Sequence, residues 1–247
     1  MTRATEASVV NEFTGLLPEP PPPFRYDFPG DDPQDPHPLL TSWVPAGARV
    51  LDIGAGTGTL AVTLRDRKGA TVVCVEPDSD RAELARARGL TVHVTDLDTF
   101  AATSPEPFDV AVLADVIEHL PYPGPIIATA RRLLKPTGHL LVSVPNAAHW
   151  TIRASLLRGR FDYEPTGLMD ATHLRWFTLA SLRRMLESCG FAVEDTLGTL
   201  GNWHPAYARF PWTLIPGRYR TSVLRRLVRW FPSVFGLQNL VRSKPVT

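Results

Sequence analysis

The chain has 247 residues, of which 44% are hydrophobic and 21% are charged. This length suits one α/β domain with a sizeable core and falls short of two ordinary enzyme domains. Basic and acidic residues nearly balance, 26 against 25, so the whole molecule is no polyelectrolyte and we expect no nucleic-acid partner.

Two features bear on the cellular compartment. The two cysteines, Cys74 and Cys189, are too few for a disulfide framework and suit a reducing environment. No apolar run reaches the ~18–20 residues of a membrane span, and the first residues lack the order of a signal peptide. We therefore expect a cytoplasmic protein, with its oligomeric state open.

Residues 1–48 form a predicted N-terminal arm. A short helix is possible over 6–17, followed by the run PEPPPP at 18–23 and a Pro/Asp-rich stretch that ends near His37. Proline removes amide donors and fixes φ, which favours a stiff extended arm over a packed element. A surface-draped tail and an active-site lid both remain open for it.

From Arg49 the pattern changes to short, nearly continuous apolar runs. They cover 49–54, 71–77, 90–96, 108–115 and 138–145, and they end in an acid, glycine or proline. Such runs are typical of parallel strands buried on both faces. Helical patterns lie between them at 57–67, 78–88 and 123–134. The alternation predicts a doubly wound α/β sheet that binds ligands beyond the carboxyl ends of its strands.

The alternation stops over residues 146–177, and connections of this length are uncommon unless they are functional. A helix resumes at 178–190, and 191–200 is predicted as a sixth strand. A basic amphipathic helix follows near 221–231, and 237–243 could form a final strand. We expect a single domain over 49–247 with a seven-stranded, mostly parallel sheet and an inserted segment at 146–177.

The strongest local signal is VLDIGAGTGTLA at 50–61. A strand runs into Gly54-x-Gly56-x-Gly58 and then into a helix, which places bare backbone and free amides against a ligand. A dinucleotide fingerprint would have its third glycine at the position of Thr59. The spacing therefore argues against NAD or FAD.

Two acids follow the next strands. Glu76 closes the second strand about twenty residues past the loop, where a carboxylate accepts hydrogen bonds from both ribose hydroxyls of an adenosine ligand. Asp96 closes the third strand, within reach of an adenine amine. Each acid alone is unspecific, but the three features on three successive strands together indicate an adenosine-containing ligand.

These motifs support a family resemblance. The segments VLDIGAGTGTLA, VEPD at 75–78, VTDLD at 94–98, FDVAVLADVIEHL at 108–120 and RRLLKPTGHLLVSVPN at 131–146 resemble the successive motifs of class I S-adenosylmethionine-dependent methyltransferases. The segment 158–178, with YDF at 26–28, is similar to a bacterial subgroup related to the ubiquinone-biosynthesis O-methyltransferases. Members of this subgroup often accompany sugar, polysaccharide or secondary-metabolite pathways.

The resemblance implies a cofactor and its contacts. S-adenosylmethionine would be bound by Asp52, Gly54, Ala55, Gly56, Gly58, Glu76, Pro77, Asp96, Leu97, Ala114 and Asp115. In this arrangement the glycine loop and Asp115 line the methionine end, Glu76 holds the ribose and Asp96 flanks the adenine. The family commonly has Cys or Gly where Ala55 stands, a departure without chemical consequence.

Methyl transfer to a hydroxyl also needs a proton acceptor, and histidine has a suitable pKa. His149 and His173 lie in the long insert and are our candidates for the catalytic base. Some relatives hold a divalent cation with residues at the positions of Asp115, Glu118 and His119. With no fourth ligand evident, we expect Glu118 and His119 to cap and orient their loop, and we predict no metal ligands.

Tyr163 and Arg175 are the insert residues that we expect to contact the acceptor. The basic helix near 221–231 is expected to cover the sheet, although weak peripheral contact with an anionic membrane is an alternative.

Together these features predict a methyltransferase that acts on a hydroxyl of a small molecule, sugar or glycan. N- or C-methylation and a non-catalytic donor-binding module remain alternatives. A nicotinamide-dependent oxidoreductase is disfavoured by Thr59.

Overall fold

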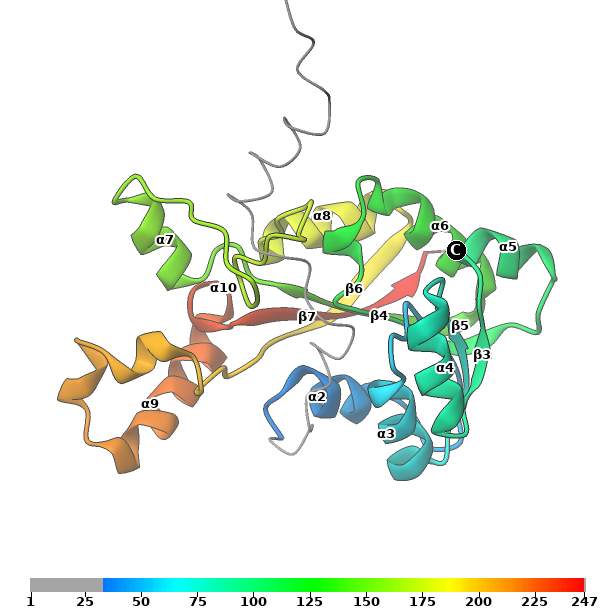
Figure 1. Ribbon diagram of the computed structural model, residues 1–247, viewed down its shortest axis with the longest axis horizontal. Helices are drawn as coiled ribbons and strands as arrows, with labels where there is room; N and C mark the ends of the chain where they lie inside the picture. The colour runs from blue at the N-terminus through cyan, green and yellow to red at the C-terminus, as the bar shows by residue number, and fades with distance from the viewer. Residues whose placement is uncertain (1–32, 247) are drawn as a thin grey trace, which may run out of the picture.

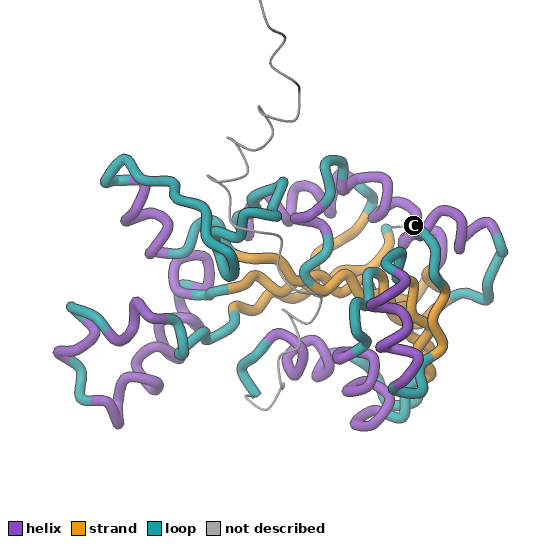
Figure 2. Tube along the Cα trace, viewed as in Figure 1, coloured by secondary structure: helices purple, strands orange, loops and turns teal. Residues whose placement is uncertain are grey.

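We analysed a computed structural model that describes residues 33–246. The predicted helix at 6–17 and the PEPPPP run therefore lie outside the described residues. Helices cover both faces of a central sheet (Figures 1 and 2). Among the described residues, no helix combines the length and hydropathy that a membrane span requires.

The sheet has seven strands in the order β3-β2-β1-β4-β5-β7-β6. Their bounds are β1 Arg49–Ile53, β2 Thr71–Val75, β3 Thr91–His93, β4 Phe108–Ala114, β5 Leu134–Pro145, β6 Phe191–Gly198 and β7 Gln238–Pro245. The first five strands pair in parallel, whereas β7 is antiparallel to both β5 and β6. The mostly parallel, doubly wound sheet predicted from the sequence is confirmed.

Two helical layers enclose this sheet. The helices are α2 Pro36–Trp43, α3 Thr59–Lys68, α4 Ser79–Ala87, α5 Leu97–Ala102, α6 Pro123–Leu133, α7 Trp150–Leu156, α8 Leu179–Ser188, α9 Gly217–Trp230 and α10 Pro232–Phe235, with short 3-10 turns η1 Ile117–His119, η2 Pro205–Ala208 and η3 Trp212–Leu214. One core joins the sheet to α2, α3 and α4, and the other joins it to α5, α6 and α8. Each face is therefore sealed by apolar side chains, as a parallel sheet requires.

The N-terminal arm differs from its prediction where it is described. Residues 36–43 form α2, which begins with proline in its first turn and buries Leu40 completely in the core beside α3. Proline is tolerated at the start of a helix because the first amides have no intrahelical acceptor. The prediction of an extended, unpacked arm is therefore wrong for residues 36–43, where Pro36 begins a helix that packs against the core.

Two further elements depart from expectation. The helix predicted over 123–134 ends at Leu133, as expected, but β5 begins at Leu134, ahead of the strand predicted over 138–145. The insert at 146–177 contains α7, and a bridge between Asn146 and Phe177 closes the insert at its base. It is therefore an anchored loop whose two ends meet beside the sheet.

Candidate functional site

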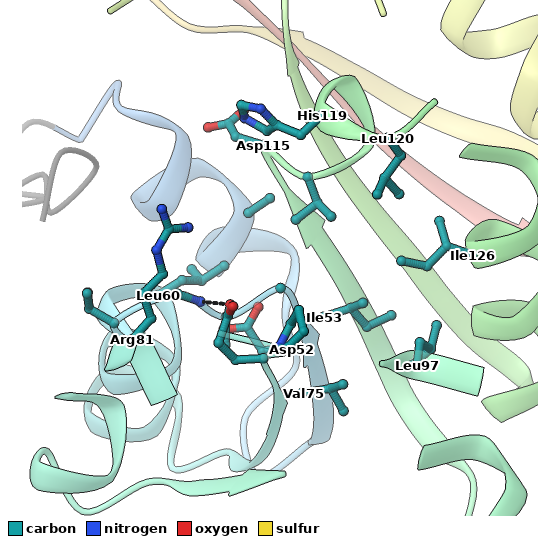
Figure 3. Close-up of a pocket in the computed structure, with 18 of the residues that line it drawn as sticks. Asp52, Ile53, Leu60, Val75, Arg81, Leu97, Asp115, His119, Leu120 and Ile126 are labelled. Carbon is teal, nitrogen blue, oxygen red and sulfur yellow. Dashed lines mark hydrogen bonds between the residues drawn. The ribbon is translucent and has the colours of Figure 1, made fainter. Parts of the chain in front are cut away.

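A cavity of about 610 Å³ lies at the carboxyl ends of β1, β2 and β4. Its lining includes Asp52, Gly54, Ala55, Gly56, Glu76, Pro77, Asp96, Leu97, Ala114 and Asp115, which are all the residues predicted to bind the cofactor except Gly58. Figure 3 shows Asp115 and His119 together at one end, away from Asp52, Val75 and Leu97. The parallel strands thus bring residues that are far apart in sequence to one edge of the sheet.

Glu76 fixes the shape of the glycine loop. Its carboxylate accepts hydrogen bonds from the amide of Gly56 at 2.7 Å and from the amide of Asp78 at 3.0 Å. Gly54 and Gly56 have φ of 70° and 56°, a region that favours glycine. A carboxylate has about four acceptor sites, so Glu76 can support the loop and still accept hydrogen bonds from a ligand.

Gly58 has a different role from the one predicted. It does not line the cavity but caps α3 with φ of 82°. A Cβ atom at this position would lie 2.3 Å from Cδ1 of Leu90 and 3.0 Å from Cβ of Ala85. The third glycine therefore allows close packing of the loop on α4 and does not contact the cavity.

Asp52 is a buried acid at the floor of the cavity. Burial, with a smaller effect of the charge on Glu76, raises its pKa to about 7. Its Oδ2 atom has no hydrogen-bond partner among residues 33–246. A cationic ligand group would compensate the carboxylate, so the position suits a positively charged ligand.

Asp96 and Leu97 also line the cavity, and Leu97 lies at the end away from Asp115 and His119 (Figure 3). The Asp96 carboxylate caps α5 by accepting a 2.7 Å hydrogen bond from the amide of Thr99, which lowers its pKa. Leu97 is buried beside it. An ionised carboxylate next to an apolar surface can receive a flat ring with an amino edge.

Asp115 lies just after β4 with φ of 53°, an uncommon conformation for a residue other than glycine. Its side chain accepts hydrogen bonds from Ser143 Oγ at 3.1 Å and from Gln238 Nε2 at 2.9 Å. Burial raises its pKa to about 6 despite these two donors. Backbone strain of this kind is commonly retained at functional sites.

A second cavity of about 370 Å³ adjoins the first. Asp115 and His119 line both cavities. The long insert contributes Glu164, Leu168 and His173, and the segment after β6 contributes Trp203 and His204. Two adjoining cavities with shared walls can hold two reactants in contact.

His119 is oriented by the insert. Its Nδ1 lies 3.2 Å from the carbonyl oxygen of Thr172. A carbonyl only accepts hydrogen bonds, so this contact favours the tautomer that carries its proton on Nδ1. The amides of Leu174 and Arg175 donate to the carbonyl of Glu118 at 2.8 and 2.9 Å, which fixes the insert to this loop.

Glu118, His119 and His173 form a cluster in which one possible ligand atom of each lies within 4.8 Å of the others. Glu118 is 1% exposed, and neither of its carboxylate oxygens has a hydrogen-bond partner within the described part of the chain. Burial and the neighbouring acids raise its pKa well above the ordinary value. The chemistry of these donors would suit a divalent cation, and the sequence alone did not place His173 beside the other two residues.

His149 is not brought to either cavity. It is fully buried, with Nδ1 at 2.8 Å from Thr151 Oγ1 and Nε2 at 3.0 Å from the Tyr207 hydroxyl. Burial lowers its pKa to about 3. It starts α7 and holds the insert to the segment after β6, and this position does not support the predicted role as a base.

The two predicted acceptor contacts also lie outside both cavities. Tyr163 is 46% exposed and packs edge-on against Phe161, with Trp176 close by. The Arg175 guanidinium donates to the carbonyl of Pro121, with Nε at 2.8 Å. Both residues brace the insert, and only its tertiary contacts could reveal this.

Sequence reasoning missed His204, Trp203 and Gln238 as lining residues because they follow the sixth strand, beyond any motif. His119 is the histidine that the sequence alone ranks below His149 and His173 as a candidate base. Its place between the cavities follows from the turn after β4, which the motif Asp115-Val116-Ile117-Glu118-His119 could have indicated.

The fold and this double cavity agree with the resemblance to class I S-adenosylmethionine-dependent methyltransferases. The sequence model of the family described as "Methyltransferase domain" matches residues 31–196, and the chain belongs to this family. Its cofactor is S-adenosylmethionine.

The chain is similar to several particular proteins. A ubiquinone biosynthesis O-methyltransferase of Xylella fastidiosa is 30% identical over 161 residues, which cover 62% of this chain and 64% of the relative. A possible histamine N-methyltransferase of Thermotoga maritima has a TM-score of 0.56 at 21% identity, covering 85% of this chain and 87% of that one. Magnesium protoporphyrin IX methyltransferase of Synechocystis with bound SAH also has a TM-score of 0.56, at 16% identity and covering 86% and 83%. The two structures support the fold alone.

Proposed function

We propose that the protein transfers the methyl group of S-adenosylmethionine to a hydroxyl of a small molecule held in the second cavity. The observation that carries this proposal is that Asp115 and His119 line both cavities. A volume of about 370 Å³ is in the range of small-molecule sites. The printed name of the Xylella relative also favours an oxygen acceptor.

In this proposal the donor occupies the first cavity. The ammonium of its methionine part pairs with Asp52, Glu76 accepts hydrogen bonds from the ribose, and the adenine lies between Asp96 and Leu97. The sulfonium methyl then points toward Asp115 and the second cavity. These assignments use the buried unpaired oxygen of Asp52 and the spare acceptor sites of Glu76.

The chemistry is an in-line displacement. An oxygen lone pair of the acceptor forms the new bond to the methyl carbon as the carbon–sulfur bond breaks, and the electron pair of that bond neutralises the sulfonium. The hydroxyl proton passes to the imidazole of His119, whose Nδ1 contacts the carbonyl of Thr172. Alignment of the two reactants supplies most of the rate enhancement, and the base adds about 10²–10⁴.

A divalent cation is an alternative to the histidine base. Glu118, His119 and His173 would hold it, and it would lower the pKa of the acceptor hydroxyl as a Lewis acid in place of proton transfer to His119. Without it, His173 contacts the His119 ring edge-on at 5.0 Å between centroids and restricts its orientation. His173 is then a positioning residue.

An amine acceptor is the second candidate. The unpaired carboxylate of Glu118 lines the second cavity near Asp115, and such an acid could pair with a cationic amine. A sugar or glycan acceptor and a cytoplasmic location also remain proposals. The latter is supported by two free cysteines.

The test begins with calorimetric titration of the purified protein with S-adenosylmethionine and, separately, with NADH. We expect micromolar binding of the sulfonium alone. Transfer of a labelled methyl group is then screened over phenols, sugars and amines. Absence of donor binding would refute the proposal, and transfer to amines alone would favour the second candidate.

The base is tested with His119→Ala against the matched control His139→Ala, a histidine that pairs with Glu194 away from both cavities. We expect His119→Ala to lower kcat by about 10² or more with donor affinity unchanged. The control should keep wild-type kcat. Retained turnover in His119→Ala would remove the histidine from the proton transfer.

A further inference from the structure

The segment between β6 and β7, residues 199–236, forms a lobe of its own, which we call the C-terminal lobe. It contains η2, η3, α9 and α10, and Tyr207, Trp212, Leu224 and Val228 share a separate small core within it. Figure 1 shows α9 projecting beyond the sheet at the end opposite α4 and α5. The family match ends at residue 196, so nothing in that match accounts for this lobe.

The charge of the C-terminal lobe is one-sided. No Asp or Glu follows Asp195 in the sequence. Four arginines of α9, namely Arg218, Arg225, Arg226 and Arg229, are exposed. A solvated surface helix usually mixes both signs of charge, so an uninterrupted basic face indicates an anionic partner.

The same lobe also exposes large apolar side chains. Trp230 is 70% exposed, Phe210 77% and Leu214 73%, and Tyr219 and Phe231 are half exposed. Scattered apolar residues are ordinary on a surface, but a concentration in one small lobe marks an interaction site. The lobe's own core is formed by other residues, so these side chains are not needed for its packing.

Helix geometry places the two kinds of side chain together. At 100° per residue, Tyr219, Arg226 and Trp230 lie on one stripe of α9, and Arg218, Arg225 and Arg229 lie on the adjoining stripe. Leu224 and Val228 are buried on the opposite side. Basic and aromatic side chains therefore share one exposed face, as on helices that lie at a membrane surface.

We propose that the C-terminal lobe docks the protein on an anionic phospholipid surface through this face of α9. Arginines attract the headgroups, while Trp230, Tyr219 and the neighbouring apolar side chains enter the interface. A nucleic acid would satisfy the arginines but would offer no apolar phase to Trp230. A second copy of this chain would bring like charges together.

Docking at this face has a consequence for the second cavity. Trp203 and His204 belong to the same lobe and line that cavity. A bound membrane would therefore lie next to an element that shapes the cavity wall. The lipid contact itself needs no methyl transfer, so its test is independent of the proposed function.

The experiment is co-sedimentation of the full chain with vesicles. Phosphatidylcholine vesicles are compared with vesicles that contain about one-third phosphatidylglycerol, at about 0.1 M and about 0.5 M salt. We expect binding to the anionic vesicles only, weakened at high salt. No binding to anionic vesicles at the lower salt would overturn the proposal.

Two triple variants test whether vesicle binding depends on the exposed face of α9 or only on the net charge of the protein. Arg225→Gln/Arg226→Gln/Arg229→Gln should weaken vesicle partitioning on the order of 100-fold. The control, Arg67→Gln/Arg183→Gln/Arg184→Gln, removes the same charge from exposed positions of α3 and α8 and should bind as wild type. Equal loss in both triple variants would refute a dedicated surface.

The apolar part is tested with Tyr219→Ser/Trp230→Ser, for which we expect at least about tenfold weaker partitioning. Unchanged partitioning of this variant, with equal competition by double-stranded RNA, would overturn the lipid assignment in favour of a polyanion site. Thermal melting and donor titration verify that each variant is folded.

Discussion

Replacing Asp52 with asparagine should change how the stability of the protein depends on pH. The native pKa of about 7 lies well above the ordinary value of 3.8. Between these two values the native state keeps a proton that the unfolded state releases. The Asp52 contribution to the free energy of unfolding is therefore present below about pH 4 and falls as pH rises to about 7.

The loss approaches about 4 kcal/mol, at about 1.4 kcal/mol per pH unit. Asparagine does not ionise, so Asp52→Asn lacks this loss. Its unpaired amide adds a penalty of about 1–3 kcal/mol that does not vary with pH. The free energy of unfolding of the variant, minus that of wild type, should therefore rise steadily from pH 4 to pH 7 and level off above.

Urea unfolding of both proteins without donor, at half-unit steps of pH, measures this difference. Glu106→Gln, at an exposed position without neighbouring cavity residues, is the control and should show a flat difference. A flat difference for Asp52→Asn as well would refute the raised pKa. The same variant should bind S-adenosylmethionine more weakly, because an amide cannot pair with the ammonium.

Three further predictions follow from the geometry. Gly58→Ala should lower the free energy of unfolding by about 1–3 kcal/mol in urea titrations, because the added Cβ atom would clash with Leu90. Donor affinity of the folded variant, measured by calorimetry, should stay within twofold. A tenfold loss of affinity would show that Gly58 contributes to donor binding. His149→Ala should lower the melting temperature, because the Tyr207 hydroxyl loses the shortest of its hydrogen bonds. It should keep kcat within about threefold at a temperature where it is folded; a hundredfold loss would support His149 as the base. If a cation is held near Glu118, chelation should lower kcat and Mg²⁺ should restore it; full activity after chelation, with no metal detected by elemental analysis, would exclude the cation.

Much of the fold could be predicted because the hydrophobic pattern of each segment agrees with its place in the folded sheet. Runs such as Val72–Val75 are apolar on both faces and are followed by an acid, which is typical of buried parallel strands and of the edge where ligands bind. The antiparallel pairing of β7 could not be read in the same way. Residues 238–245 alternate only weakly, and direction depends on which strand edge remains open.

The site was predictable only where a motif combines sequence and geometry. The glycine loop, Glu76 and Asp96 follow strands whose ends coincide by topology. The histidines were not distinguishable from sequence, since His149 and His173 both lie in the insert and only their tertiary contacts separate them. The deciding contact, Thr172 with His119, joins residues 53 positions apart.

The place of β7 in the sheet bears on how the chain folds. Beyond the β4–β5 pair, the described sheet is continued only through β7, and Leu140 pairs with Ser243, about a hundred residues later. Contacts between residues so far apart in sequence form slowly, so we expect the edge of β5 to be open while the first five strands assemble. An open apolar edge can pair with other chains. The yield of refolding should therefore fall as protein concentration rises. By pairing with β5, strand β7 covers the edge at which other chains could otherwise add.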